Sequence, residues 1–332
     1  MRNAEPRLGI VYEHPQWFAP LFAELDRRGV PFDRIDLSRH RFDPMEAVPW
    51  TIALNRLSPS AFLRGHGQTI VYGREFLRFL EWRGADVVNN AAAFGLEASK
   101  ASQLLLLEAL GLRTPRARVI NHPAQARDAA EQLKFPVIVK PNVGGSGAGI
   151  QRFDTLEQLT ETAATGVVDM GIDGTALVQE FLPARGDHIV RVEVLAGRFL
   201  YAIKVYPNFA AGFNLCPADI CQPEEMQAAD LCPVDLPKVA LKVEGYTPSE
   251  AVIRDVLAIT RRAGIDLGGV EYLVNDRDGE IYFYDVNVLS NFVSDAPSVV
   301  GFDPYAVLVD YLVERGRLPQ VGGRIAVRAG IS

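Results

Sequence analysis

The sequence predicts an α/β protein in which a mostly parallel N-terminal domain precedes two α+β subdomains. Strands alternate with helices from Leu8 to Asn89, which favours a mostly parallel sheet. Further along, a short apolar strand, Val137–Val139, enters a glycine-rich loop, and a second apolar hairpin runs from Gly268 to Val286. Adjacent strands joined by short turns pair antiparallel, so both later regions are expected to be α+β.

Composition narrows the class of protein. The chain has 332 residues, 48% hydrophobic and 23% charged, with a net charge of −7, as in ordinary globular proteins with ample core. This charge gives no reason to bind nucleic acid or an anionic membrane. No apolar stretch approaches ~18 residues and residues 1–10 lack a signal-peptide core, so a cytoplasmic location is expected.

The three cysteines, Cys216, Cys221 and Cys232, lie within one short segment. An odd, sparse count fits reduced thiols better than a disulfide framework. A zinc site would need a fourth ligand, and the nearest histidine, His188, lies well upstream. We therefore expect these cysteines to be small apolar fillers.

The N-terminal elements follow in order. Strands are expected at Leu8–Tyr12, Phe32–Leu37, Thr51–Asn55 and Ala85–Asn89, with helices at Trp17–Arg28 and Thr69–Trp82. Open α/β sheets bind ligands at the carboxyl ends of their strands, and Arg56 and Ser58 fall just past the third strand. Both are substrate candidates, with a solvated loop as the alternative.

The next segment is expected to hold one long helix, Leu96–Leu110, ended by Gly111. Lys100 lies near its start, where a cation does not favour the helix dipole, which suggests another role for it; a solvated surface lysine is the alternative, favoured on this observation alone. A strand at Arg116–Ile120 and a helix at Pro123–Leu133, capped by Asn121, complete this stretch.

The glycine loop is the most informative motif. Lys140 ends the strand, Pro141 follows it, and Gly144, Gly145, Gly147 and Gly149 surround Ser146 and Ala148. Such a backbone can take positive φ and approach a ligand closely, its N–H groups can cradle phosphate oxygens, and Lys140 adds a cation. A flexible hairpin turn is the alternative reading of this loop alone.

A single strand, two strand pairs and three helices are expected after the loop. A helix is expected at Leu156–Ala164, and then a strand at Ala176–Leu182 that embeds Glu180 among apolar residues. Arg191–Gly197 and Phe199–Val205 are expected to form a hairpin that turns at Gly197 and Arg198, with Lys204 in its second arm. Helices at Ser249–Arg262 and Asp303–Arg315 flank the last hairpin.

Between these elements the pattern breaks down from Pro207 to Pro248, where prolines and acids interrupt any period. We expect an irregular insertion or lid, since long irregular segments in compact domains are usually functional or disordered. It directly follows Lys204, so Asn208 and Asn214 are candidates to bind substrate.

The last hairpin carries the candidate metal ligands. Glu271 lies on one arm, and Asp285 and Asn287, two residues apart, share one face of the other. Two carboxylates and an amide oxygen suit Mg²⁺, which prefers to be held jointly with phosphates; Mn²⁺ is a substitute. A phosphate loop, lysines and a magnesium site together indicate ATP.

With these motifs the chain resembles the ATP-grasp carboxylate–amine ligases, in particular RimK-type glutamate ligases and glutathione synthetases. The resemblance is strongest from Asn89 to Asn287 and rests on NNAAAFGLEASKASQLLLLEALGLRTP, VIVKPNVGGSGAG, LVQEFL, GVEYLV and YDVN. It implies a pre-ATP-grasp domain at residues 1–92, an ATP-grasp subdomain with the linker helix and glycine hairpin at 93–183, and a second subdomain with the metal site at 184–332.

The resemblance also implies roles for single residues. Lys100 would contact the nucleotide, Lys140 the α- and β-phosphates, and Asp187 would lie near the ribose. Arg191 and Lys204 would present cations to the transferring phosphate and the acyl substrate. The adenine segment would comprise Gln179, Glu180, Phe181 and Leu182; the phosphate loop Gly144, Gly145, Ser146 and Gly147; and the metal site Glu271, Asp285 and Asn287.

Two departures from the family pattern concern the metal strand and the residues immediately after it. Asp285 stands where the family more often has Glu, and Asn287-Val-Leu-Ser290-Asn291 stands for Asn-x-Ser-Pro-Gly. Ser290 and Asn291 are therefore counted among the acceptor-binding candidates.

The expected function is an ATP-dependent ligase that joins a small-molecule carboxylate to an amine through an acyl phosphate. A kinase of the same fold and a non-catalytic nucleotide-binding module remain as alternatives. A NAD-dependent enzyme is disfavoured, because the glycine run would have to lie between a strand and a helix, whereas strand-like residues come after it. A homo-oligomer is left open.

Overall fold

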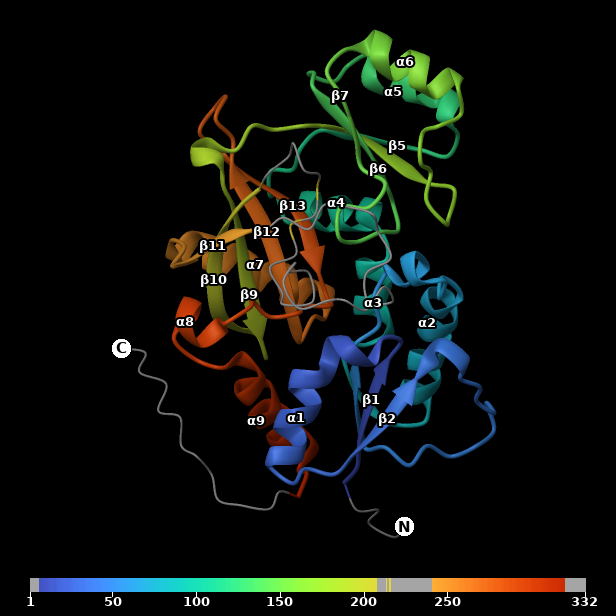
Figure 1. The fold of residues 1–332 in the computed structure, drawn as a ribbon, viewed down its shortest axis with the longest axis vertical. Coiled ribbons are helices and arrows are strands. Elements are labelled where there is room, and N and C mark those ends of the chain that lie inside the picture. The colour runs from blue at the N-terminus through green and yellow to red at the C-terminus, as the bar shows by residue number, and fades with distance from the viewer. Residues whose placement is uncertain (1–5, 208–212, 214, 216–240, 320–332) are drawn as a thin grey trace.

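The computed structural model describes residues 6–207, 213, 215 and 241–319, and it contains three sheets (Figure 1). The predicted insertion therefore falls largely outside the described residues, as do Asn208, Asn214 and the three cysteines. No helix in the described part of the chain is long and apolar enough to cross a membrane.

The first sheet is parallel, with strand order β2-β1-β3-β4. Its strands are β1 (Leu8–Tyr12), β2 (Phe32–Asp36), β3 (Ile52–Asn55) and β4 (Asp86–Val88), and its helices α1 (Ala19–Arg27) and α2 (Gln68–Trp82). The apolar strands are buried on both faces, which is why they read as continuous hydrophobic runs. The predicted parallel unit is confirmed.

The second sheet is antiparallel, with order β5-β8-β6-β7, and helices α5 and α6 cover one face (Figure 1). The glycine loop joins β6 to β7, so the predicted hairpin is confirmed. The elements are β5 (Ala117–Ile120), α5 (Ala126–Ala130), β6 (Val137–Pro141), β7 (Gln151–Phe153), α6 (Leu156–Ala164) and β8 (Ala176–Glu180).

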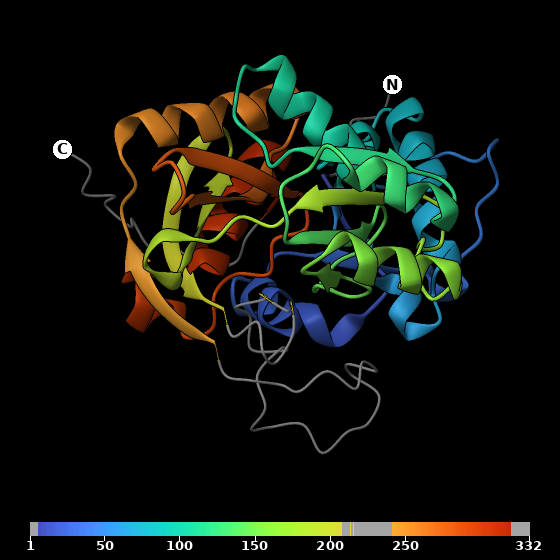
Figure 2. The same ribbon diagram turned by 90° about the horizontal axis from the view of Figure 1, so that it is seen from above.

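The third sheet is antiparallel, with order β11-β10-β9-β12-β13. Its strands are β9 (Ile189–Leu195), β10 (Arg198–Tyr206), β11 (Lys242–Tyr246), β12 (Leu267–Val274) and β13 (Ile281–Asn287). Apolar residues of α4 (Lys100–Ala109) and α7 (Glu250–Ala263) bury one face. The other face packs with α9 (Pro304–Gly316), α1 and the first sheet. Seen from above, the second and third sheets stand side by side over the first (Figure 2).

Three expectations, two about helices and one about the insertion, were wrong. The helix expected at Leu96–Leu110 is two helices, α3 (Ala91–Glu97) and α4, because Ser99 leaves helical geometry and its side chain accepts from Ser102 N. The helix expected at Pro123–Leu133 is a 3-10 turn followed by the short α5, and His122 rather than Asn121 caps it.

The third concerns the insertion, which was expected to stay irregular as far as Pro248. Lys242–Tyr246 instead forms β11 and pairs antiparallel with β10 at the edge of the third sheet. Its charged residues and Gly245 hid this strand, because edge strands tolerate exposed charges that central strands do not. One further short helix, α8 (Ala296–Val300), was not expected.

Candidate nucleotide and metal site

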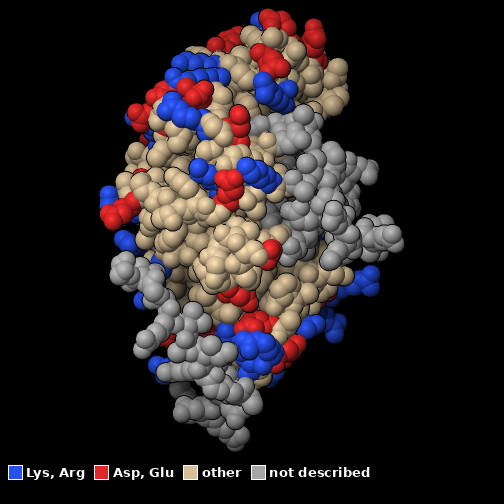
Figure 3. All heavy atoms as spheres, turned by 60° about the vertical axis from the view of Figure 1, so that its left-hand side comes forward, with Lys and Arg blue, Asp and Glu red and all other residues tan. Residues whose placement is uncertain are grey.

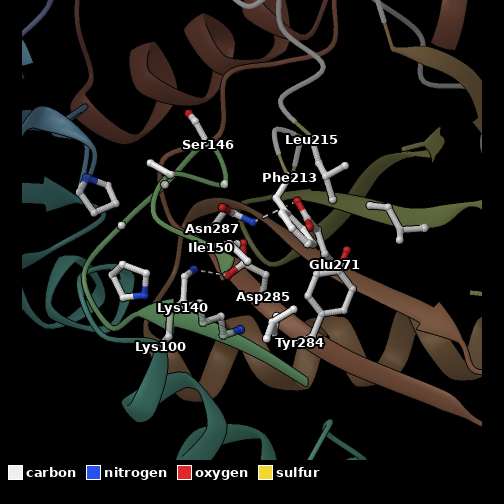
Figure 4. A pocket seen from close by; sticks show the side chains of 18 of the residues that line it. Lys100, Lys140, Ser146, Ile150, Phe213, Leu215, Glu271, Tyr284, Asp285 and Asn287 are labelled. Atoms are coloured by element: carbon white, nitrogen blue, oxygen red, sulfur yellow. Dashed lines mark hydrogen bonds and ion pairs between the residues drawn. The ribbon is translucent and has the colours of Figure 1, made fainter. Parts of the chain in front are cut away.

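A cavity of about 200 Å³ lies where the glycine hairpin faces the third sheet and the loop after β3 (Figure 4). It gathers residues of the second and third sheets and of the loop after β3, although these lie far apart in the sequence. The predicted site residues that line it are Ser58, Lys100, Lys140, Gly144, Gly145, Ser146, Gly147, Gln179, Glu180, Phe181, Leu182, Arg191, Glu271, Asp285, Asn287 and Asn291.

The glycine loop closes one side of this cavity. Ser146 and Gly147 take positive φ of 54° and 70°, which turns the chain over the pocket. Gly149 has φ 72°, and a Cβ there would lie 2.3 Å from Asp169 Oδ2 and 2.8 Å from Pro141 Cγ. Gly145 contacts the loop after β3, since a Cβ there would lie 3.3 Å from that of Ser60. The loop conformation therefore depends on glycine at 149.

Two lysines enter the pocket from different elements. Lys140 is the fourth of the five buried residues of β6 and is 4% exposed; the strand runs one residue past the end expected at Lys140 and includes Pro141. Lys100 is the first residue of α4, and its position is tied to β6 because its N–H donates to Asn142 O at 3.1 Å. Asn142 Oδ1 also accepts from Ala101 N at 2.9 Å. Asn142 thus holds the start of α4 against the end of β6.

The two lysines differ in charge state. Burial, and then the charge of Lys100, lowers the pKa of Lys140 to about 7. Burial also acts to lower the pKa of Lys100, but Asp285, whose Oδ1 accepts from Lys100 Nζ at 2.7 Å, outweighs burial and raises it. Of these two lysines, Lys100 is therefore a permanent cation at neutral pH, whereas Lys140 titrates.

The acidic residues face these lysines from the last hairpin (Figure 4). Glu271 and Asp285 are directly opposite each other on β12 and β13, and Asn287 Nδ2 donates to Glu271 Oε1 at 3.4 Å. Burial and then Asp285 raise the pKa of Glu271. Burial would also raise the pKa of Asp285, but Lys100 and Lys140 outweigh it and lower the pKa. The predicted metal residues are thus brought together.

This donor set fits a hard divalent cation that shares its coordination with phosphates. Two carboxylates and one amide converge, and the described residues contain no cluster of three or more His, Cys, Asp and Glu side chains that could enclose a metal. Mg²⁺ commonly binds through one or two carboxylates together with phosphate oxygens. The set does not suit zinc, which prefers nitrogen and sulfur ligands.

Arg191 joins the acidic group from β9. Its Nε donates to Glu193 Oε1 at 2.6 Å, its Nη1 to Glu271 Oε1 at 3.0 Å and its Nη2 to Ser290 Oγ at 3.4 Å. Burial acts to lower the pKa of Arg191, but Glu193 and then Glu271 outweigh burial and raise it. The guanidinium is therefore a fixed charge at the wall of the pocket.

Lys204, the other expected cation of this hairpin, is not among the residues that line the pocket. It pairs with Val190, whereas Arg191 pairs with Ile203, so Lys204 lies on the opposite face of the sheet from Arg191. Its ammonium lies 4.8 Å from the centroid of the Tyr246 ring. The structure does not bring the two expected catalytic cations together.

The expected adenine segment lines the pocket where β8 ends. Glu180 is 6% exposed, and its Oε1 accepts from Lys134 N at 2.9 Å, so its charge has a backbone partner. The N–H of Phe181 donates to Pro136 O at 2.9 Å, which fixes the chain as it leaves the sheet. Asp187 is exposed and is not among the lining residues, so the structure does not bring it to this pocket.

The substrate candidates form the opposite wall. Arg56 is 1% exposed, and its Nη2 donates to Ser290 O at 2.7 Å and to Asn291 Oδ1 at 3.0 Å. Burial lowers its pKa to about 10. Ser58 and Asn291 line the pocket, with Ser58 Oγ 2.7 Å from Ser60 Oγ, while Arg56 and Ser290 lie behind them. Arg56 thus supports this wall rather than forming it.

Several lining residues were missed by sequence reasoning. Trp17 and Ser60 line the pocket without belonging to any motif, and Tyr284 lines it as a residue of YDVN to which no role was assigned. Glu97 also lines it, and burial raises its pKa to about 7. The sequence does not reveal the role of Glu97, because its partners are backbone N–H groups of Val288 and Leu289, and a backbone partner leaves no matching side chain in the sequence.

Comparisons with known proteins concern the family and the fold. Residues 106–199 match the family described as D-ala D-ala ligase C-terminus. The chain is 31% identical over 135 residues to a probable alpha-L-glutamate ligase of Teredinibacter turnerae, and the match covers 40% of this chain but only 44% of that protein.

Solved structures match over most of the chain. A RimK domain protein ATP-grasp from Sphaerobacter thermophilus has a TM-score of 0.65 at 18% identity and covers 92% of this chain and 98% of that one. A D-alanine–D-alanine ligase from Bacillus anthracis complexed with ATP has a TM-score of 0.64 at 17% identity and covers 94% and 97%. The family resemblance and the fold class expected from the sequence are confirmed.

Proposed function

Because the chain has the ATP-grasp fold, we propose that it is an ATP-dependent carboxylate–amine ligase that forms an amide through an acyl phosphate. One observation carries the proposal. Lys100 and Lys140 meet Glu271 and Asp285 in a single pocket under the glycine loop. Cations for phosphates and oxygen ligands for a metal are what an ATP-driven reaction requires of a protein.

The groups that line the pocket each have a place in this reaction. Lys140 and the N–H groups of the glycine loop would bind phosphates, and Gln179 to Leu182 would hold the adenine. Glu271, Asp285 and Asn287 would hold Mg²⁺, which neutralises phosphate charge when bound. The proposed domain boundaries at residues 92 and 183 assign a separate sheet to each domain.

The substrate carboxylate would take the γ-phosphoryl group of ATP, with release of ADP. The amine nitrogen would then bond to the carbonyl carbon and lose a proton as phosphate leaves. Arg191 lies between Glu271 and Ser290, which is behind the wall formed by Ser58 and Asn291, and there it would stabilise the negative charge that develops. Phosphoryl transfer depends mainly on such positioning and charge stabilisation.

The substrates are proposed only as classes. The wall formed by Ser58 and Asn291 offers hydroxyl and amide groups, which hydrogen-bond carboxylates and amines alike. A small carboxylate such as an amino acid or peptide, with an amine acceptor, is the proposed pair. A screen of ADP release over pooled amino acids, dipeptides and polyamines, with mass spectrometry of the products, would identify both.

The test of reaction type uses hydroxylamine. With ATP, metal and the correct acid, an acyl phosphate is expected to be trapped as a hydroxamate of that acid. A stable phosphoester without hydroxamate would show a kinase and overturn the ligase proposal while leaving the ATP site in place. Nucleotide binding without ADP release for any substrate in the screen would favour a binding module instead.

A further inference from the structure

The strand that carries Asp285 and Asn287 is the last strand of its sheet. The order β11-β10-β9-β12-β13 leaves β13 with no neighbouring strand on its outer side among the described residues. An edge strand presents unpaired backbone N–H and C=O groups there and is free to shift unless something holds it. Helix α4 lies along this edge (Figure 1).

Gln103 of α4 occupies the place of the missing strand. Its Oε1 accepts from Val286 N at 3.1 Å, and its Nε2 donates to Val286 O at 3.0 Å. This is the two-bond exchange that a facing residue makes in an antiparallel sheet. Val286 lies between Asp285 and Asn287, and Gln103 is 2% exposed, so water does not compete for these bonds.

Two further side chains of the same helical pair hold β13 and the residues after it. The Glu97 carboxylate accepts from Val288 N and from Leu289 N, the latter at 3.0 Å. Lys100 Nζ donates to Asp285 Oδ1 at 2.7 Å. The end of the strand is therefore held on both sides of Gln103, and the nucleotide lysine belongs to the same unit.

We propose that Gln103 is a positioning residue for the metal site: by fixing Val286 it sets the separation and direction of Asp285 and Asn287. This inference rests on the proposed function, since it assumes that those two residues bind the metal. Side chains on either side of Val286 point to the same face, so a shift of that one residue displaces both ligands. Mg²⁺ tolerates little departure from octahedral geometry and is sensitive to such a displacement.

The experiment compares Gln103→Leu and Gln103→Asn with wild type. Leucine keeps the volume but loses both bonds, while asparagine keeps the amide but is one methylene too short. Glu108→Gln, an exposed change on the same helix, is the matched control. Mn²⁺ affinity is measured by electron paramagnetic resonance in the presence of ADP, and exchange of the Val286 amide by hydrogen–deuterium exchange with residue-level fragmentation.

Both Gln103 variants are expected to bind Mn²⁺ about tenfold more weakly, as is typical when a group that orients a metal ligand is lost, and to exchange the Val286 amide faster. Glu108→Gln should change neither quantity. Weaker Mn²⁺ binding without faster exchange, or faster exchange with unchanged Mn²⁺ binding, would overturn the proposal. Wild type that binds no Mn²⁺ with ADP would instead contradict the proposed metal site, and the exchange measurement would still report whether Gln103 holds the strand.

Discussion

Lys100 Nζ lies 2.7 Å from Asp285 Oδ1, and across the same pocket Arg191 Nη1 lies 3.0 Å from Glu271 Oε1. Both carboxylates expected to hold the metal are thus paired with cations. A nucleotide draws such cations to its phosphates, while a metal draws the carboxylates. If only the metal binds, Lys100 loses Asp285 as its partner, and if only the nucleotide binds, Asp285 loses Lys100. When both bind, the lysine gains a phosphate and the carboxylate gains the metal.

Metal and nucleotide should therefore bind cooperatively. We expect ADP to bind roughly 5- to 150-fold more tightly with Mg²⁺ than in EDTA, the range of a typical coupling between two sites. Isothermal titration calorimetry under the two conditions measures this ratio. In Asp285→Asn the ratio should approach one, because the pair that couples the ligands is lost. Equal affinities in wild type would contradict the prediction.

Asp285→Asn should leave the protein folded and reduce ADP release by about two orders of magnitude, since it removes a charge at the point where phosphate charge gathers. Coupled-enzyme detection of ADP measures the rate, and circular dichroism checks the fold. Asp276→Asn, in the turn of the same hairpin with a side chain 62% exposed, is the control and should keep the wild-type rate. Near-normal turnover in folded Asp285→Asn would remove Asp285 from the site.

The pKa of Lys140 predicts that nucleotide binding is accompanied by proton uptake. Its pKa of about 7 leaves the side chain mostly neutral in the free protein at about pH 8.5, whereas a bound phosphate favours the ammonium and raises the pKa. Binding at this pH should take up as much as about one proton, and affinity should fall as pH rises above 7. Calorimetry in buffers of different ionisation enthalpy measures the uptake. Lys140→Met should abolish it; wild type without uptake would show that Lys140 is already charged.

Two glycines of the loop, Gly149 and Gly144, are expected to respond differently to replacement by alanine. In Gly149→Ala, the new Cβ would meet Asp169 and Pro141 in a backbone conformation with φ 72°, so the loop must rearrange. We expect a loss of about 1–3 kcal/mol of unfolding free energy, measured by denaturant titration. A Cβ at Gly144 meets nothing within 4 Å, so Gly144→Ala should retain wild-type stability. Equal losses of unfolding free energy in both variants would show that the close approach of residue 149 to Asp169 and Pro141 does not set the cost of the substitution.

Much of the fold was predictable because its signals are local. The buried strands of the first sheet are continuous apolar runs, and the last hairpin has a turn sequence, NDRDG, between two apolar arms. That hairpin placed Glu271 on one arm and Asp285 and Asn287 on the other. The direct pairing of Glu271 with Asp285 depends on a register shift between Glu271 and Tyr272, for which the sequence has no signal. The break before α4 was not predictable, because Ser99 within an alanine- and leucine-rich run does not reveal that Asn142 holds the next residues.

Lys204 illustrates how a small local error moves a side chain to the wrong face. A turn at Gly197 and Arg198 would place Arg191 opposite Lys204. The structure turns instead at Ala196 and Gly197, and a bulge lies between Phe199 and Tyr201. The net shift of one residue pairs Lys204 with Val190, and in a strand a shift of one reverses the face. Neither irregularity has a clear sequence signal.

The partners of Arg56 were equally hidden, since Ser290 and Asn291 lie more than two hundred positions along the chain. This separation has a consequence for synthesis. At roughly 5–20 residues per second, Arg56 leaves the ribosome about 12–47 s before Ser290, and in that interval its guanidinium lacks these partners. Desolvation of Arg56 therefore belongs to the last steps of folding, and one wall of the pocket exists only after the whole ATP-grasp region has been made.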